Sequence, residues 1–197
     1  MSHNSAIAVV TGATGGIGRA IALDLVKEGI DVCLVARNSK RLNDLADEIN
    51  RSSTKAFVFK ADFIDDNEIL FFADKLNEEF KGIDILVHSA GNIMLGDIQD
   101  ASLADFDMMY RVNLRAPFLL TQKLLPALKY KKGQVVFINS SAGLHAKAGA
   151  AQYAATKHAL KAISDSLREE VNDFGVRVLS VYPGRTASPM QEEVCRM

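Results

Sequence analysis

Short runs of apolar residues alternate along the chain with longer segments in which apolar positions recur every three or four residues. Runs of the first kind are typical of strands buried on both faces, and segments of the second kind are typical of helices that cover a sheet. The pattern predicts strands at residues 6–10, 31–36, 55–60, 83–88, 134–139 and 176–182. It predicts helices between them, at residues 16–28, 39–50, 65–80, 102–130 and 151–174.

This alternation indicates a parallel sheet whose crossovers are helices. Because such crossovers are right-handed, we expect a doubly wound, three-layer α/β sandwich that binds its ligand at the carboxyl ends of the strands. The fourth predicted helix contains two prolines, so a kink is expected near Pro117 and fraying near Pro126.

The chain has 197 residues, of which 23 are Lys or Arg and 24 are Asp or Glu, and 48% are hydrophobic. These values are typical of one globular domain, here residues 1–197. A formal net charge of -1 disfavours nucleic-acid binding. No uninterrupted apolar run reaches about 18 residues, and the N-terminus lacks the charged region of a signal peptide, so no membrane partner is expected. Cys33 and Cys195 form no disulfide framework or zinc motif, which indicates a cytoplasmic location.

The first predicted strand ends in Thr11-Gly-Ala-Thr-Gly-Gly-Ile-Gly18 and leads directly into a helix. Backbone N–H groups at a helix N-terminus bind phosphate. Gly12 would allow the tight turn, Gly16 the approach of a pyrophosphate, and Gly18 the close packing of helix on strand. Glycines also occur in ordinary turns, but the strand before these and the helix after them favour a nucleotide site.

The residue after the second predicted strand distinguishes between two cofactors. NAD sites usually have an acidic residue here for the ribose hydroxyls, whereas this chain has Arg37, which can pair with a 2′-phosphate. The sequence therefore favours NADP(H) over NAD(H). The alternative is that Arg37 is only an exposed residue at the start of a loop. Asp62 follows the third strand and either accepts a hydrogen bond from an adenine amino group or caps the next helix.

Tyr153 and Lys157 are four residues apart in a predicted helix, so their side chains share one helical face. A nearby ammonium group favours the phenolate, so we expect Lys157 to lower the pKa of Tyr153 toward neutral. The same spacing occurs by chance on many helices. Ser140, however, follows the fifth strand at its carboxyl end, where its hydroxyl could donate a hydrogen bond to a substrate carbonyl. The three residues together indicate acid–base catalysis.

In these motifs the chain resembles the short-chain dehydrogenases/reductases, from residue 6 to about residue 190. The resemblance is carried by the glycine loop, Ser89-Ala-Gly91, Asn113, Ser140, Tyr153-Ala-Ala-Thr-Lys157 and Pro183-Gly184. It implies a Rossmann-like sheet with the strand order 3-2-1-4-5-6. It also implies an oxidoreductase with the catalytic residues Asn113, Ser140, Tyr153 and Lys157.

The family mechanism makes Tyr153 the acid in carbonyl reduction and the base in alcohol oxidation. Lys157 would lower its pKa and hold the nicotinamide ribose, and Ser140, with Ser141 as the alternative, would steady the substrate oxygen. Asn113 would bind a water that links Lys157 to solvent, although an Asn in a helix could simply bond to neighbouring backbone. No metal is expected. The resemblance implies cofactor contacts from Gly12, Thr14, Gly15, Gly16, Ile17, Gly18, Arg37, Asn38, Asp62, Phe63, Ser89, Ala90, Gly91, Tyr153, Lys157, Pro183, Gly184 and Thr186.

The chain departs from the family pattern at three places. His88-Ser stands where many members have Asn-Asn before Ala-Gly, which changes a side-chain contact. Gly15 stands where many NADP-using members have a basic residue, which leaves Arg37 as the main phosphate contact. The chain stops at Met197, inside a segment that resembles the family's substrate loop, so we expect the usual seventh strand to be absent and the chain to be truncated at its C-terminus.

The sequence thus predicts an NADP(H)-dependent oxidoreductase that reduces a carbonyl compound or oxidises the corresponding secondary alcohol. Two alternatives are a 3-oxoacyl-[acyl-carrier-protein] reductase and a dinucleotide-binding sensor or scaffold without turnover. Residues 92–95, 142–147 and 183–190 are expected to line the pocket for a small-molecule substrate, where Lys147 could meet an acidic group or face water. The resemblance also implies a homodimer or homotetramer.

Overall fold

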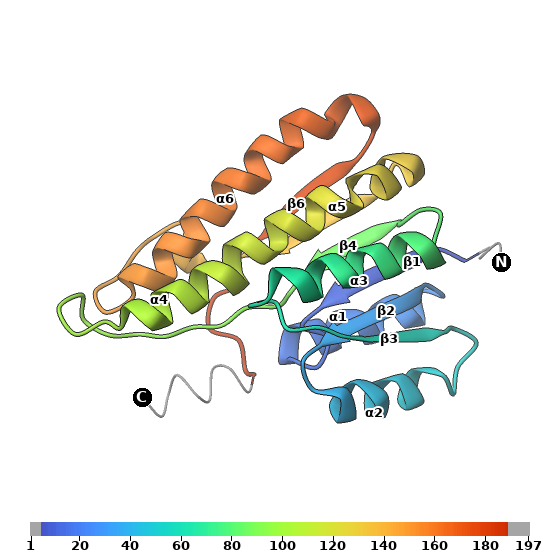
Figure 1. Ribbon diagram of the computed structural model, residues 1–197, viewed down its shortest axis with the longest axis horizontal. Helices are drawn as coiled ribbons and strands as arrows, with labels where there is room; N and C mark the ends of the chain where they lie inside the picture. Colours follow the sequence, from blue (N-terminus) through green and yellow to red (C-terminus); the bar gives the residue numbers. More distant parts are fainter. Residues whose placement is uncertain (1–4, 189–197) are drawn as a thin grey trace.

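The computed structural model describes residues 5–188, and the strands within them form one parallel six-stranded sheet (Figure 1). The strand order is β3-β2-β1-β4-β5-β6, so the predicted order is confirmed. The order reverses between β1 and β4, and the carboxyl ends of these two strands therefore flank the expected ligand site. The strands are β1 (Ile7–Thr11), β2 (Asp31–Ala36), β3 (Ala56–Lys60), β4 (Ile85–His88), β5 (Gln134–Ile138) and β6 (Arg177–Val181).

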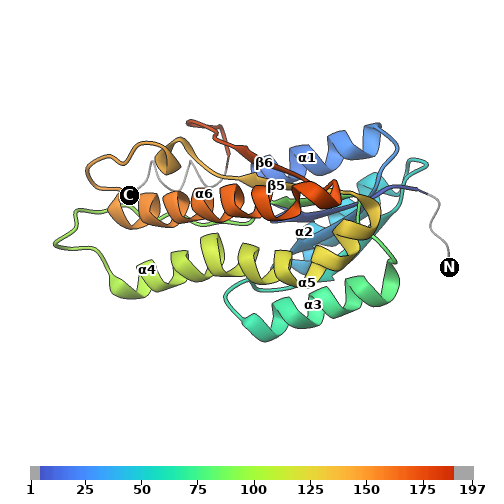
Figure 2. The same ribbon diagram turned by 90° about the horizontal axis from the view of Figure 1, so that it is seen from above.

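The helices form two layers, one on each face of the sheet. Figure 2 shows α1 on one side of the strands and α3, α5 and α6 on the other, so the doubly wound architecture is confirmed. Helix α2 packs on the same face as α1. The helices are α1 (Gly16–Lys27), α2 (Ser39–Ile49), α3 (Asp66–Glu79), α4 (Leu103–Tyr110), α5 (Ala116–Lys131) and α6 (Ala151–Val171), with short 3-10 turns at Ser141–Gly143 and Asn172–Phe174.

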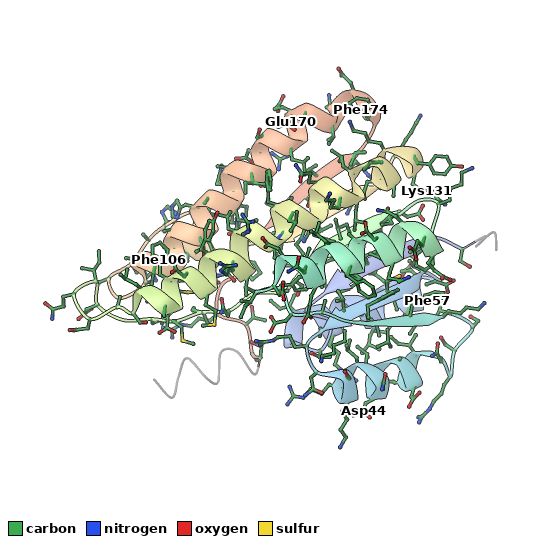
Figure 3. All side chains as sticks on the ribbon, in the orientation of Figure 1. Asp44, Phe57, Phe106, Lys131, Glu170 and Phe174 are labelled. Carbon is green, nitrogen blue, oxygen red and sulfur yellow. The ribbon has the colours of Figure 1, made fainter. Side chains whose placement is uncertain are left out.

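Successive residues of a strand contribute to the two halves of the core. In β1, Ile7 and Val9 face the layer of α3, α5 and α6, whereas Ala8 and Val10 face α1 and α2. Every residue of β1 and β2 is buried, as expected for strands covered on both faces. Phe57, labelled in Figure 3, lies at the β3 edge. Its ring meets that of Phe80 edge-on, with ring centroids 5.1 Å apart.

Double coverage does not extend to β6. Leu179 and Val181 are 43% and 44% exposed, on the sheet face that carries α1. Among residues 5–188 no helix covers that face of β6, because α1 packs on β1 and β2 and α2 packs on β2 and β3. The expectation that all six strands are covered on both faces is therefore wrong for β6 in the described part of the chain.

The predicted helix at residues 102–130 consists of α4, a π-helical segment at Arg111–Arg115, and α5. Pro117 lies in the first turn of α5, directly after the wider π turn. A proline ring clashes with the carbonyl four residues earlier in an α-helix, which explains an irregular turn at this place. The expected fraying near Pro126 is wrong, since α5 continues to Lys131 and buries Ala127 and Leu128 beyond the proline.

In the described range, no helix is both long and apolar enough to cross a bilayer. The expectation that the seventh strand is absent concerns the part of the chain after Ser188. The last two residues of the expected pocket segment 183–190 also belong to that part. Both predictions fall outside the described residues.

Candidate active site

The glycine loop packs closely against the end of β4. Gly12 has φ +64°, and a Cβ there would lie 2.8 Å from the Ala90 Cα. A Cβ at Gly18 would lie 2.4 Å from the Gly12 carbonyl oxygen. Both distances are too short for any side chain, so these two positions require glycine. The predicted roles of Gly12 in the turn and of Gly18 in helix–strand packing agree with this geometry.

The N-terminus of α1 provides hydrogen-bond donors for an anion. Gly15 is its N-cap and offers no side-chain hydrogen bond, and the first turn contains no acidic residue. The first N–H groups of the helix therefore have no intrahelical partner, and the helix dipole favours negative charge at this point. The arrangement fits a phosphate group at the glycine loop.

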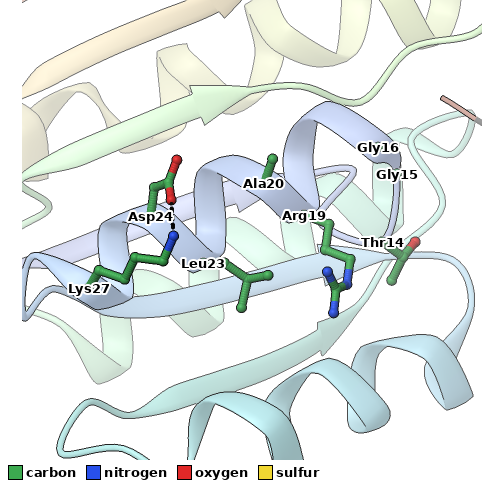
Figure 4. A pocket seen from close by; sticks show the side chains of 8 residues that line it. All are labelled: Thr14, Gly15, Gly16, Arg19, Ala20, Leu23, Asp24 and Lys27. Atoms are coloured by element: carbon green, nitrogen blue, oxygen red, sulfur yellow. Dashed lines mark hydrogen bonds and ion pairs between the residues drawn. The ribbon is translucent and has the colours of Figure 1, made fainter. Parts of the chain in front are cut away.

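An open groove of about 480 Å³ runs along α1 from Thr14, Gly15 and Gly16 (Figure 4). Its charged side chains are paired: Lys27 donates to Asp24 at 2.7 Å, and Arg19 donates to Glu48 of α2 at 2.6 Å. The groove thus adds no unpaired charge to the phosphate site.

The end of β1 is tied directly to the loop after β4. The Thr11 hydroxyl oxygen accepts hydrogen bonds from the backbone N–H groups of Ser89 and Ala90, both at 3.0 Å. This pair of bonds fixes the carboxyl ends of the two strands at the point where the strand order reverses. His88, the family departure next to this loop, is buried and lies outside the cavity lining, with Nε2 2.8 Å from the Thr121 hydroxyl and its ring stacked on Phe137.

A second cavity, of about 310 Å³, lies beside this loop and contains the predicted catalytic groups. Ser140, Tyr153 and Lys157 all line it, although they come from the end of β5 and from α6. The predicted cofactor contacts that join them in the lining are Ile17, Ser89, Ala90, Gly91, Pro183, Gly184 and Thr186.

Burial dominates the electrostatics of this cavity. The Lys157 side chain is buried, which lowers its pKa to about 8, and its ammonium group donates to the Ile138 carbonyl at 3.1 Å. Burial raises the pKa of Tyr153, while a hydrogen bond with Ser140 lowers it. The expectation that Lys157 lowers the pKa of Tyr153 toward neutral is therefore wrong: the pKa is raised, because burial disfavours the charged phenolate. The Lys157 nitrogen lies 5.9 Å from the centre of the Tyr153 ring.

Asn113 lies in the π segment and is almost fully buried. Its side-chain oxygen accepts from the Asn92 N–H at 2.9 Å, and its side-chain nitrogen donates to the Asn92 carbonyl at 2.9 Å and to the Thr156 hydroxyl at 3.2 Å. The side chain is therefore fully engaged with protein groups. The expected role of Asn113 in binding a water stays a prediction.

One further residue positions the catalytic groups and was not predicted. The Asn139 side chain donates to the Lys157 carbonyl at 3.1 Å and accepts from the Ser140 N–H at 2.9 Å, so it joins the end of β5 to α6. The polar residue directly before Ser140 was the available sequence signal. Asn92, in the expected pocket segment 92–95, lines the cavity as predicted, and its buried side-chain oxygen has no hydrogen-bond partner within residues 5–188.

The adenosine side of the predicted site lies outside this cavity. Arg37 is exposed after β2 and makes no hydrogen bond or ion pair with residues 5–188. Asn38 caps α2 by accepting from the Arg41 N–H at 3.0 Å. Phe63 is buried in the core, so its ring is not exposed to a ligand. The alternative that Asp62 caps α3 is wrong: Asp65 is the cap, and Asp62 accepts from the Ile64 N–H at 3.1 Å.

Among residues 5–188, no three His, Cys, Asp or Glu side chains gather closely enough to hold a metal ion.

The fold and the cavity define a Rossmann-like α/β protein with a site at the strand-order reversal. The family model for short chain dehydrogenase matches residues 6–197. An uncharacterized oxidoreductase of Staphylococcus epidermidis is 38% identical over 187 residues, which are 94% of this chain and 80% of the relative. The chain belongs to the short chain dehydrogenase family and is an oxidoreductase.

Solved structures of the family superpose closely. An alcohol dehydrogenase from Thermococcus sibiricus, complexed with 5-hydroxy-NADP, gives a TM-score of 0.91 at 28% identity and covers 95% of this chain and 80% of its own. The actinorhodin polyketide ketoreductase with NADPH gives 0.92 at 30% identity and covers 100% of this chain and 77% of its own.

Proposed function

We propose that this protein is an NADP(H)-dependent oxidoreductase that reduces a carbonyl group, or oxidises the corresponding secondary alcohol, with Tyr153 as the acid or base. The observation that supports this proposal is the convergence of Ser140, Tyr153 and Lys157 on one cavity next to the loop Ser89–Gly91. A residue set of this kind has no use in a protein that only binds a dinucleotide, so the sensor or scaffold alternative is disfavoured.

Each side chain of the cavity has its own role in the proposed reaction. A bound reduced nicotinamide supplies the hydride. The Ser140 hydroxyl, already hydrogen-bonded to the phenol, orients the substrate oxygen, and the Tyr153 phenol gives that oxygen its proton. The Lys157 charge favours the phenolate that remains, and Asn113 would bind the water that links Lys157 to solvent. Asn139 positions Ser140 and Lys157 relative to each other.

The residues present fit a dinucleotide. The uncapped N-terminus of α1 provides donors for its pyrophosphate, and the glycines at positions 12 and 18 allow the loop to form. The exposed Arg37 guanidinium, without a partner in the described part of the chain, would bind the 2′-phosphate of NADP(H). Two of the similar solved structures carry NADP-type ligands, which agrees with this preference.

A second candidate is reduction of a 3-oxoacyl group on a carrier protein, and the similarity to a polyketide ketoreductase favours it. It uses the same catalytic residues and differs only in substrate. We also propose one domain for residues 1–197, a cytoplasmic location, and a homodimer or homotetramer. The exposed Phe118 of α5, at 51%, is one apolar residue available to such an interface.

The test of the proposed function is the substitution Tyr153→Phe. We expect the dissociation constant of NADPH, measured by nicotinamide fluorescence, to change less than about twofold, because the phenol ring is retained. Turnover of a panel of ketones and aldehydes should fall about 100-fold or more, since general acid catalysis contributes 10²–10⁴-fold. Tyr130→Phe, at an exposed position in α5, is the matched control. Substantial turnover in Tyr153→Phe would refute the assigned acid.

A further inference from the structure

The cavity that contains Tyr153 has a lining of one charge sign. The residues that line it within the described range include no Asp or Glu, although the chain has 24 such residues. They include the cationic side chains of Lys147, Lys157 and Arg185, together with His145. Cavities with partly enclosed walls concentrate the field of such residues, so this one attracts anions.

Two of these cations have no side-chain partner in the described part of the chain. Lys147 and Arg185 are exposed and form no hydrogen bond or ion pair through their side chains with residues 5–188. Some other cations of the protein are paired, as Lys161 is with Asp165, whereas the exposed Arg37 is not. Lys157 differs from both, because it is buried and bonded to the Ile138 carbonyl. Lys147 and Arg185 are therefore available to a ligand.

The two available cations lie on neighbouring loops. Lys147 belongs to the segment between the 3-10 turn Ser141–Gly143 and α6, and Arg185 belongs to the segment after β6. The backbone bond from the Ser141 N–H to the Pro183 carbonyl, at 2.9 Å, ties these segments together. Lys147 thus lies on the short connection that leads from Ser140 to Tyr153, and all three residues line the same cavity.

We propose that the substrate is a small oxo acid, or the matching hydroxy acid, whose carboxylate is bound by Lys147 with Arg185 as a second cation. This inference rests on the proposed function and names its substrate class. The cavity of about 310 Å³ also contains the acid that protonates the carbonyl, so the anionic group has to lie close to that carbonyl. A carrier-bound acyl group holds its phosphate at the far end of a long arm and fits this requirement less well.

The cofactor does not account for Lys147. Its phosphates are assigned to the N-terminus of α1 and to Arg37, and neither Lys147 nor His145 belongs to those segments. Arg185 directly follows Gly184, a predicted cofactor contact, so its charge could serve either ligand. A substitution of Lys147 therefore tests binding of the substrate carboxylate without removing a cation that is assigned to the cofactor.

The experiment compares anionic substrates with neutral ones of the same shape. The activity of the full chain is measured with NADPH on 2-oxo and 4-oxo acids, each paired with its methyl ester. We expect the wild type to have the higher kcat/KM for the acids, mainly through KM. In Lys147→Gln the ratio of acid to ester kcat/KM should fall about fivefold or more, as expected for the loss of one charge partner in a partly enclosed site. Added salt should lower the wild-type ratio as well.

Lys55→Gln is the matched control, because Lys55 is exposed at the opposite edge of the sheet, just before β3. It should leave the ratio unchanged. Equal or better use of the esters by the wild type, or preference for 3-oxoacyl phosphopantetheine thioesters over the acids, would overturn the inference. So would a Lys147→Gln variant that weakens NADPH binding while the ratio stays constant.

A binding measurement separates this inference from the proposed function. The Tyr153→Phe variant saturated with NADPH is titrated with the same acids and esters, which requires no turnover. Tighter binding of the acids, abolished by adding Lys147→Gln, supports the anion site even if the assigned acid is wrong. If the enzyme turns over neutral ketones and shows no preference for the acids, the proposed function is supported and the inference that the substrate is an oxo acid is refuted.

Discussion

The side chain of Asn113 holds the backbone of Asn92 on both sides, accepting from its N–H and donating to its carbonyl, each at 2.9 Å. Asn113 belongs to the π segment between α4 and α5, and Asn92 follows the loop Ser89–Gly91. The pair therefore joins the helix layer to the wall of the cavity. A third bond, to Thr156, extends the link to α6 one residue before Lys157.

Asn113→Ala removes these three hydrogen bonds and leaves the Asn92 backbone groups without partners. We expect a loss of about 2–4 kcal/mol in the free energy of unfolding, because unpaired buried groups keep their full desolvation cost. Urea denaturation measures this loss. Asn43→Ala, at an exposed position of α2, is the control and should change stability by less than about 0.5 kcal/mol. Equal stability of the two variants would show that the backbone bonds to Asn92 are not needed.

The burial of Lys157 makes stability depend on pH. Its pKa is lowered from 10.5 to about 8, so between these values the unfolded chain binds more protons than the folded one. Stability contributed by this group therefore rises with pH across that window, and the full penalty for burying its charge applies below about pH 8.

Lys157→Met removes this titration. We compare the free energies of unfolding of the variant and the wild type. The value of the variant minus that of the wild type should decrease by roughly 3 kcal/mol as the pH rises from 8 to 10.5, the range between the folded and the ordinary pKa of Lys157. Denaturation of both proteins at several pH values measures the difference and cancels the titration of other groups. A difference that stays constant would mean that Lys157 keeps its ordinary pKa.

Much of the site could be predicted because its residues are defined by motif and by position on a strand or helix. The carboxyl ends of parallel strands meet at one edge, which explains why Ser140 and Ser89 share a cavity although they are far apart in the chain. The strand order follows from the same motif set.

Other features depend on packing that no periodic pattern encodes. The π segment arises from the fit of Asn113 and Pro117 within a helix that sequence periodicity predicts as continuous. Phe63 was expected at the cofactor but turns its ring into the core, since the rings of β3 and α3 leave an apolar site there. The raised pKa of Tyr153 comes from burial, whose depth a sequence does not give.

Ser140 and Ser141 offer a direct comparison of two adjacent hydroxyls. Ser140 is half-buried and hydrogen-bonded to the Tyr153 phenol, whereas Ser141 is exposed and begins the 3-10 turn, although both line the cavity. We expect Ser140→Ala to lower kcat by about 10²–10³-fold, the usual effect of removing a group that stabilises developing charge on oxygen. Ser141→Ala should change kcat less than about threefold. The reverse order, measured by steady-state kinetics, would move the assignment to Ser141.

Gly18 and Gly96 differ in what an added methyl group meets. At Gly18 it would overlap the Gly12 carbonyl, whereas at Gly96 nothing lies within 4 Å. Gly18→Ala should therefore push α1 away from β1 and lower both thermal stability and NADPH affinity, by about 2 kcal/mol or more in stability. Gly96→Ala should leave both unchanged. Thermal denaturation and fluorescence titration of the two variants measure this, and equal behaviour would contradict the tight packing of the loop.

Arg37 decides between the two nicotinamide cofactors. It is the residue after β2 and has no partner among residues 5–188, so its guanidinium can bind a 2′-phosphate that only NADP(H) carries. Arg37→Ala should weaken NADPH binding at least about tenfold, since charge-assisted bonds of this kind contribute about 1.5–3 kcal/mol, and should change NADH binding less than about twofold. Parallel fluorescence titrations measure both constants, with Arg51→Ala, an exposed arginine after α2, as the control. If Arg37→Ala weakens both cofactors equally, or neither, the preference for NADP(H) has another source and Arg37 is a surface residue.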